Sequence, residues 1–153
     1  METLESKLLN SEELQERLDY WQNVLGLQNW QIKVIVVKDE DMPIKNTQGV
    51  CSMIEPIRSA TIYILDPEDF DMEHPFNMEQ IIIHELLHCK TNCYTQHLKR
   101  KSKKYLMYEQ ENDHLATILY NLNKKAENRD EIKESGKTSA RKLKPGKPQD
   151  ATK

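Results

Sequence analysis

The segment from Asn77 to His88 constrains the fold of this chain more than any other, because it predicts a helix that is apolar on nearly every side. Asn77 is a residue type that caps helix N-termini, and Gln80 follows three positions later, as in a capping box. The apolar residues that follow cover most of a helix's circumference: Met78, Ile81, Ile82, Ile83, Leu86 and Leu87. Such a helix has to be covered on most of its surface. We therefore expect it to lie at the centre of the protein.

The residues before and after this segment predict two further helices and three strands. Apolar residues recur at spacings of 4, 3 and 4 within residues 11–27, with Ser11 as the expected N-cap. Strands are predicted at 30–37, 49–55 and 60–65, the last two close enough in sequence to form a hairpin. A last helix is expected from about 104 to 125, with these apolar positions on its buried face: Tyr108, Leu115, Ile118, Leu119 and Leu122. The fold class is α+β, a small and mostly antiparallel sheet packed on helices in the order α-β-β-β-α-α.

Charge is divided unevenly along the 153 residues. Residues 1–123 hold 12 Lys+Arg against 20 Asp+Glu, whereas residues 124–153 hold 10 against 5. The C-terminal segment has only Ile132 and Leu143 as large aliphatic residues, which is too little apolar surface to offset the entropy lost on ordering. We expect one folded domain over 1–123 and a disordered basic tail over 124–153. A basic tail could contact nucleic acid, but a solvated end is favoured.

Two features bear on the compartment in which the chain works. The longest apolar runs, around 34–37 and 81–83, are much shorter than the ~18–20 residues of a membrane span. The three cysteines are odd in number and lack the spacing of a disulfide framework, which favours a reducing compartment. We therefore expect a cytosolic protein without a membrane-spanning helix.

The central helix contains the sequence His84-Glu85-Leu86-Leu87-His88. Positions 84 and 88 lie one helical turn apart on one face, so both imidazoles can bind a single ion at ~2.0–2.1 Å. Buried histidines are costly without partners, and a metal supplies one. Zn²⁺ lowers the pKa of a bound water to about 7, and Glu85, beside that face, can accept its proton as the water attacks a carbonyl. We expect Zn²⁺ as cofactor, His84 and His88 as ligands and Glu85 as general base; histidines that only hydrogen-bond to neighbours are the alternative.

In its context this motif resembles the zincin metallopeptidases. HELLH on a capped apolar helix, followed by the E-x-x-x-D element from Glu109 to Asp113, is similar to the gluzincin branch. The metzincin branch is not supported, since the residues after His88 lack its glycine and third histidine. Over roughly residues 20–120 the chain also resembles small metallopeptidases of bacteriophages and prophage regions, through these segments: WQNVLGLQNWQIKV, SATIYIL and MEQIIIHELLH.

The gluzincin resemblance implies Glu109 as the third zinc ligand and Asp113 as the acid that orients a ligand histidine. Glu111 is the main rival, because it shares a helical face with three of the apolar residues predicted to be buried. His114 and Asp113 itself are further candidates. The resemblance also implies that a strand beside the metal holds an extended substrate, and we expect residues 60–65 to be that strand. Three tyrosines are candidates for stabilising an oxyanion, with packing as their alternative role: Tyr94, Tyr105 and Tyr108.

The expected function is therefore a zinc-dependent metallopeptidase that acts on a peptide or protein substrate. Two alternatives come from other classes of protein. One is a non-catalytic, zinc-containing interaction module of phage or prophage origin. The other is a DNA-associated metalloprotease, recruited through the tail and through residues 99–104, where five of six residues are basic.

Overall fold

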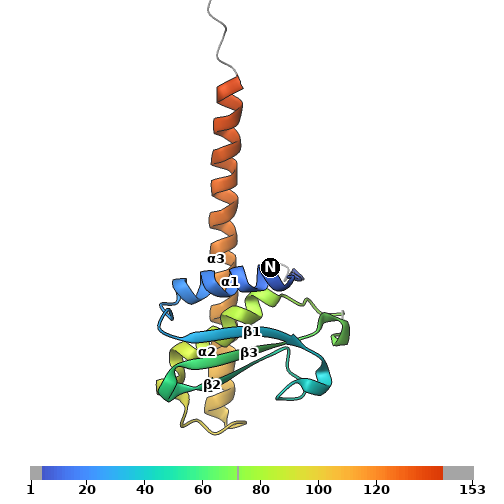
Figure 1. Cartoon of the computed structure of the whole chain (residues 1–153), viewed down its shortest axis with the longest axis vertical. Helices are drawn as coiled ribbons and strands as arrows, with labels where there is room; N and C mark the ends of the chain where they lie inside the picture. The colour runs from blue at the N-terminus through green and yellow to red at the C-terminus, as the bar shows by residue number, and fades with distance from the viewer. Residues whose placement is uncertain (1–4, 72, 143–153) are drawn as a thin grey trace, which may run out of the picture. The chain divides into compact units, whose positions relative to one another are not determined.

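The computed structural model describes residues 5–71 and 73–142, and the chain divides into two compact units, residues 1–120 and 121–153. The elements of the first unit are α1 (Ser11–Val24), β1 (Gln31–Val37), β2 (Gly49–Ile54), β3 (Ser59–Leu65), α2 (Met78–Thr95) and the beginning of α3 (Lys103–Lys142) (Figure 1). The expected α+β class is confirmed. Over the described ranges, no helix combines the length and the apolar character needed to cross a bilayer.

The sheet is mixed, so the expectation of a mostly antiparallel sheet is wrong. The strand order is β1-β3-β2, with β1 parallel to β3 and β2 antiparallel to β3. The expected hairpin of β2 and β3 is present, and Arg58 adopts a left-handed conformation in its turn (φ +48°). β1 and β3 both run in the direction opposite to β2. They form a parallel pair because β3, the most buried strand, lies between β1 and β2 and pairs with each of them.

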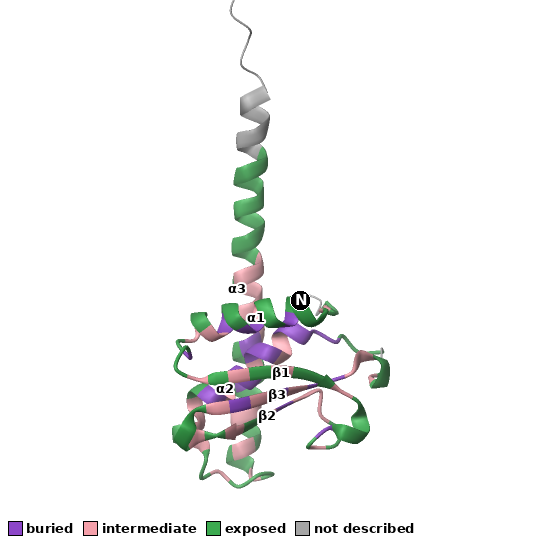
Figure 2. Cartoon of the chain, in the orientation of Figure 1, coloured by how far each residue is buried: buried purple, intermediate pink, exposed green. Residues whose placement is uncertain are grey.

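Both α1 and α2 cover the same face of the sheet. α1 contacts β1 and α2, and α2 contacts β2 and β3. The side chains of β3 alternate in burial, with Ala60, Ile62 and Ile64 buried on the face toward the helices. Eight of the twelve residues of α2 from Met78 to Cys89 are buried, and the buried part of the helix lies against the sheet and α1 (Figure 2). The central position expected for this helix is confirmed.

The caps of the first two helices follow from short polar side chains. Asn77 caps α2 as expected, and its side chain accepts a hydrogen bond from the Gln80 N–H at 3.0 Å. The expected N-cap of α1, Ser11, is wrong by one residue, because Asn10 is the residue that precedes the first turn. The Asn10 side chain accepts from the N–H of Glu13, and the Glu13 carboxylate accepts in return from the N–H of Asn10, which completes a capping box.

The buried face of α3 in the first unit differs from the face that its apolar periodicity predicts. Asn112 and Ala116 are buried, whereas Leu115 and Ile118 are 46% and 41% exposed. The orientation follows from polar contacts with α2, which involve these residues of α3: Tyr108, Glu109, Asp113 and Thr117. Polar partners on α2 therefore decide which face of α3 turns inward.

α3 continues into the second unit as far as Lys142. The composition predicts a disordered tail over 124–153, whereas residues 124–142 are helical and residues 143–153 lie outside the described residues. Lys, Glu, Arg and Ala are good helix formers, and a helix satisfies its backbone hydrogen bonds without burying apolar surface. The composition argument concerns only tertiary burial and so did not detect this local structure.

Candidate metal centre

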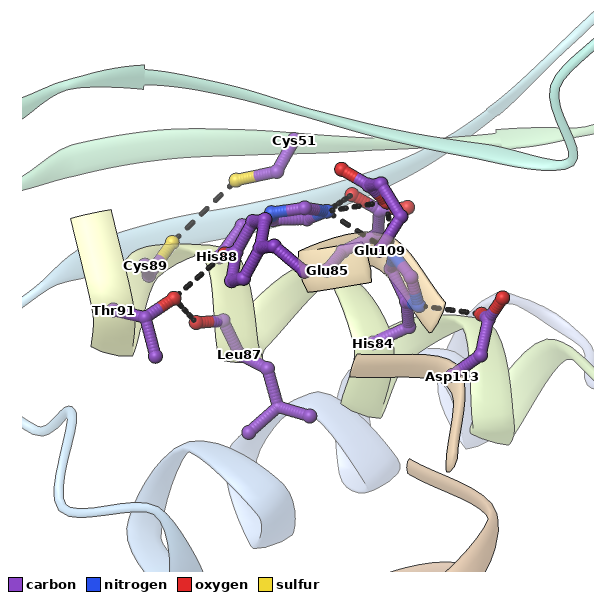
Figure 3. Close-up of polar contacts among 10 residues, drawn as sticks. Cys51, His84, Glu85, Leu87, His88, Cys89, Thr91, Glu109 and Asp113 are labelled. Atoms are coloured by element: carbon purple, nitrogen blue, oxygen red, sulfur yellow. Dashed lines mark hydrogen bonds and ion pairs between the residues drawn. The ribbon is translucent and has the colours of Figure 1, made fainter. Parts of the chain in front are cut away.

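The candidate site lies in the first unit, where α2 and the first turns of α3 meet beside β2. α2 presents His84 and His88 one turn apart, with Glu85 between them and the sheet (Figure 3). α3 brings Glu109 to the same place. The side chains of the two histidines are 14% and 17% exposed and that of Glu109 is 26% exposed, so the group is largely shielded but open to a ligand.

Three ligand atoms form a nearly regular triangle. Nε2 of His84 lies 3.1 Å from Nε2 of His88 and 3.2 Å from Oε2 of Glu109, and the third side, from His88 Nε2 to Glu109 Oε2, is 3.6 Å. In a tetrahedral zinc site with ligands at ~2.0–2.1 Å, two ligand atoms are about 3.3 Å apart. The donor set of two imidazoles and one carboxylate therefore fits a zinc ion with one coordination position left open.

The rival third ligands lie elsewhere. Glu111 and His114 are exposed on other faces of α3. Asp113 approaches His84 from the far side of the ring, with Oδ1 2.8 Å from Nδ1. With its hydrogen on Nδ1, the nitrogen beside that carboxylate, His84 has the lone pair of Nε2 left for a metal ion. Of the four candidates, the structure brings only Glu109 to the Nε2 atoms of both histidines.

The charges of this group are strongly coupled. Burial lowers the pKa of His84, but its contacts with Asp113 and Glu109 outweigh burial and raise the pKa to about 10. Burial raises the pKa of Glu109, yet hydrogen bonds with His84, His88 and Tyr105 bring it far below its usual range. The carboxylate of Glu109 is thus held as an anion, which is the form that binds a metal ion.

Glu85 lies beside the ligand triangle without belonging to it. It is buried, and its Oε2 is 4.0 Å from Nε2 of His88. Burial raises the pKa of Glu85, while the neighbouring histidines and the backbone N–H of Cys51, which donates to it, act in the opposite direction. A buried carboxyl group with a raised pKa next to a metal position suits a general base.

Gly49 at the start of β2 makes room for Glu85. A Cβ atom at Gly49 would lie 2.7 Å from Oε1 of Glu85 and 2.5 Å from Cγ2 of Ile81, closer than such atoms approach in proteins. Sequence reasoning missed this glycine, because the close approach depends on the packing of β2 against α2. A glycine at the start of a predicted strand was the only signal.

Two cavities meet at the site. One, of about 580 Å³, is lined by residues that include Gln48, Gly49, Asn77, Gln80, His84, Glu85, Glu109 and Thr117. The other, of about 490 Å³, is lined by residues that include Val50, Met53, His84, Glu85, His88, Arg100, Tyr105 and Glu109. The candidate metal position therefore lies where the two hollows meet, beside Gly49 at the start of β2, and the second hollow continues along β2 to Met53.

No protein-family model, curated protein or solved structure matches this chain.

The strand expected to hold a substrate is the wrong one. β3 is hydrogen-bonded on both sides, to β1 and to β2, so its backbone has no free edge. β2 is an edge strand, and no strand of the described part of the chain pairs with its outer side. Both cavities reach Gly49, the first residue of β2. An extended peptide can add to that edge.

The three tyrosines considered for oxyanion stabilisation are in different positions. Tyr94 is 76% exposed. The hydroxyl of Tyr108 lies 2.9 Å from Nδ1 of His88, on the side of the ring away from the ligand triangle. Tyr105 lines the second cavity, and burial together with its hydrogen bond to Glu109 raises its pKa to about 12. Because a carboxylate can only accept, the hydroxyl hydrogen of Tyr105 is donated to Glu109, so Tyr105 orients that carboxylate.

Proposed function

We propose that this protein is a zinc-dependent metallopeptidase that hydrolyses peptide bonds in a peptide or protein substrate. The observation that carries the proposal is the triangle of His84, His88 and Glu109 ligand atoms, with sides of 3.1–3.6 Å, next to the buried carboxyl group of Glu85. Two imidazoles, a carboxylate and an adjacent general base are the parts that metal-assisted peptide hydrolysis needs.

His84, His88 and Glu109 would hold the ion. A bound zinc ion supplies a water of lowered pKa and polarises the substrate carbonyl. Glu85 takes the proton of the attacking water on its carboxylate and then delivers it to the leaving amine. Its burial keeps that proton away from bulk solvent between the two transfers. Asp113 holds His84 in orientation, and Tyr105, whose hydroxyl donates to Glu109, holds that carboxylate in place.

The substrate would lie extended along the outer edge of β2. The backbone groups on that edge can pair with the substrate backbone, which gives affinity without selecting a sequence. The two cavities on either side of the metal position would then receive substrate side chains from both sides of the bond that is cut. The site thus accommodates the interior of an extended segment.

The experiment compares the wild-type protein with Glu85→Gln after both are loaded with zinc. Glu85→Gln should retain one zinc ion per chain and lose hydrolysis of a peptide library by about 10²–10⁴-fold, because the general base is gone. Glu111→Gln, an exposed carboxylate of α3, is the matched control and should behave as wild type. Equal cleavage by wild type and Glu85→Gln would overturn the mechanism. Stoichiometric zinc without cleavage of any peptide would favour a non-catalytic zinc-containing module.

The ligand set is tested separately by zinc content. Alanine at His84, His88 or Glu109 should abolish stoichiometric zinc binding, and alanine at Glu111 should not. Zinc retained by Glu109→Ala would exclude that residue as the third ligand.

A further inference from the structure

The ring of His88 is held by a chain of hydrogen bonds whose direction can be worked out from its far end. The hydroxyl of Thr91 donates to the backbone carbonyl of Leu87 at 2.8 Å, the usual bond of a helical threonine to the carbonyl four residues earlier. A carbonyl oxygen can only accept, and a hydroxyl has a single hydrogen. The hydrogen of Thr91 is therefore committed, and Thr91 can act toward any other partner only as an acceptor.

The next bond in the chain follows from this. The hydroxyl of Tyr108 lies 2.6 Å from Oγ1 of Thr91, so Tyr108 must be the donor. With its hydrogen used, the Tyr108 oxygen can only accept from its other neighbour, Nδ1 of His88 at 2.9 Å. His88 therefore carries its hydrogen on Nδ1. Its Nε2 is left with a free lone pair, which faces the Nε2 of His84 and the carboxylate of Glu109.

The two histidines of the site are thus oriented by different chemistry. His84 has a carboxylate partner, Asp113, whose side chain is 76% exposed. His88 has a neutral partner, Tyr108, which is partly buried and is itself held by Thr91 on the helix that carries the histidine. The relay from Leu87 through Thr91 and Tyr108 to His88 links α2 to α3 and back to α2.

We propose that Tyr108 and Thr91 are positioning residues that set the tautomer and ring orientation of His88 for metal binding. The inference rests on the proposed zinc site but not on hydrolysis. An imidazole whose second nitrogen is correctly bonded presents a fixed lone pair, and loss of such a partner typically weakens metal binding about 10–100-fold.

The test measures zinc affinity of the full chain by competition with a chelator. Tyr108→Phe, which keeps the ring and its packing, should weaken zinc binding about 10–100-fold. Thr91→Val should weaken it less, because the Tyr108 hydroxyl can still accept from His88 but has lost its own acceptor. Thr91→Ser should restore wild-type affinity. Tyr94→Phe is the matched control, since it removes the hydroxyl of an exposed tyrosine on α2.

A cobalt spectrum provides a readout that a purely structural role would not change. Cobalt(II) loaded in place of zinc should show altered visible absorption bands in Tyr108→Phe and unaltered bands in Tyr94→Phe. The double variant Tyr108→Phe/Thr91→Val should bind zinc no more weakly than Tyr108→Phe alone, because both changes break the same relay. Thermal unfolding of the metal-free variants shows whether each one folds.

The outcomes separate this inference from the proposed function. If the wild-type chain binds zinc tightly and Tyr108→Phe binds it within twofold as tightly, with an unaltered cobalt spectrum, the relay has no positioning role. Fully additive losses in the double variant would also overturn it. If the wild-type chain binds no zinc, the proposed zinc site itself fails.

Discussion

Asp113 Oδ1 lies 2.8 Å from Nδ1 of His84, on the side of the ring opposite the nitrogen that faces His88 and Glu109 (Figure 3). The contact joins α3 to α2 through a ligand candidate, so it orients the ring and connects the two helices at once. A carboxylate in this position also increases the basicity of the ligand nitrogen.

Replacing Asp113 should therefore weaken zinc binding. We expect Asp113→Ala to lower zinc affinity about 10–100-fold and Asp113→Asn to lower it less, because Asn keeps an oxygen beside Nδ1 of His84 but carries no charge. Chelator competition measures the affinity, with Glu111→Gln as the control. Unchanged affinity in Asp113→Ala would mean that the contact does not support the metal.

Gly49→Ala should disturb Glu85 without removing a ligand. The added methyl group would overlap Oε1 of Glu85 and Cγ2 of Ile81, and overpacking of this kind costs about 1–3 kcal/mol of unfolding free energy. We expect zinc content to stay at one ion per chain while peptide hydrolysis falls at least tenfold. Ser52→Ala, an exposed position on the same strand, should change neither quantity. Normal hydrolysis in Gly49→Ala would show that Glu85 does not need its observed position.

Glu79 should be a stability residue and not a site residue. It is 1% exposed, accepts from Nε1 of Trp21 at 2.8 Å and pairs with Lys7 and with Arg17. Glu79→Ala leaves the buried Trp21 N–H without this acceptor and opens a cavity, so the free energy of unfolding should fall by about 2–3 kcal/mol.

Glu79→Gln keeps an acceptor for Trp21 and should cost less than Glu79→Ala. Urea unfolding of the two variants and the wild type measures the difference, and zinc affinity should be unchanged in both. A loss in Glu79→Gln equal to that in Glu79→Ala would show that charge, and not the Trp21 bond, dominates.

Removal of the metal should loosen α3 more than the rest of the first unit. The core of the sheet, α1 and α2 is apolar, whereas polar contacts at the candidate site join α3 to α2. At a free zinc concentration of 100 times Kd, zinc should stabilise the fold by about 2.7 kcal/mol. Hydrogen exchange after chelation should speed up in residues 103–120 and stay slow in β3. Equal exchange with and without zinc would contradict a bridging metal.

Acid should weaken the ion pair between Lys38 and Asp66, which are 2.8 Å apart at the ends of β1 and β3. Hydrogen bonds from Lys38 and from the N–H of Glu68 bring the pKa of Asp66 below its usual value of 3.8. Hydrogen bonds to Asp66 and Glu68 raise the pKa of Lys38 above 10.5. A lowered folded pKa of an acid stabilises the fold above the unfolded pKa, and this is lost as pH falls through the folded value.

The raised pKa of Lys38 acts at the other end of the range, where its contribution is lost above 10.5. Lys38→Gln should therefore melt slightly below wild type between about pH 4 and pH 10, and the two curves should converge as the pH falls below that window. The effect is small because the pair is exposed. A difference in melting temperature that persists at pH 2 would assign it to packing.

The sequence by itself determined the local features of this protein. Residues 78–95 form a helix because their pattern and cap are local, and a helix of any orientation places His84 and His88 on one face. The same holds for the hairpin of β2 and β3, whose strands are separated by a short turn. These features depend on residues a few positions apart, so a linear pattern contains them.

Only the tertiary structure decided which distant residues meet. Glu109 and Glu111 are two residues apart on one helix, and the choice between them depends on the face of α3 that turns toward α2. The apolar periodicity of α3 predicted that the face with Glu111 turns inward. That prediction is wrong, because polar contacts with α2 set the orientation of α3. Likewise, β2 and not β3 has the free edge because β3 pairs with strands from both sides. Contacts between distant segments depend on how whole helices and strands pack. The spacing of residue types along the chain does not specify that packing.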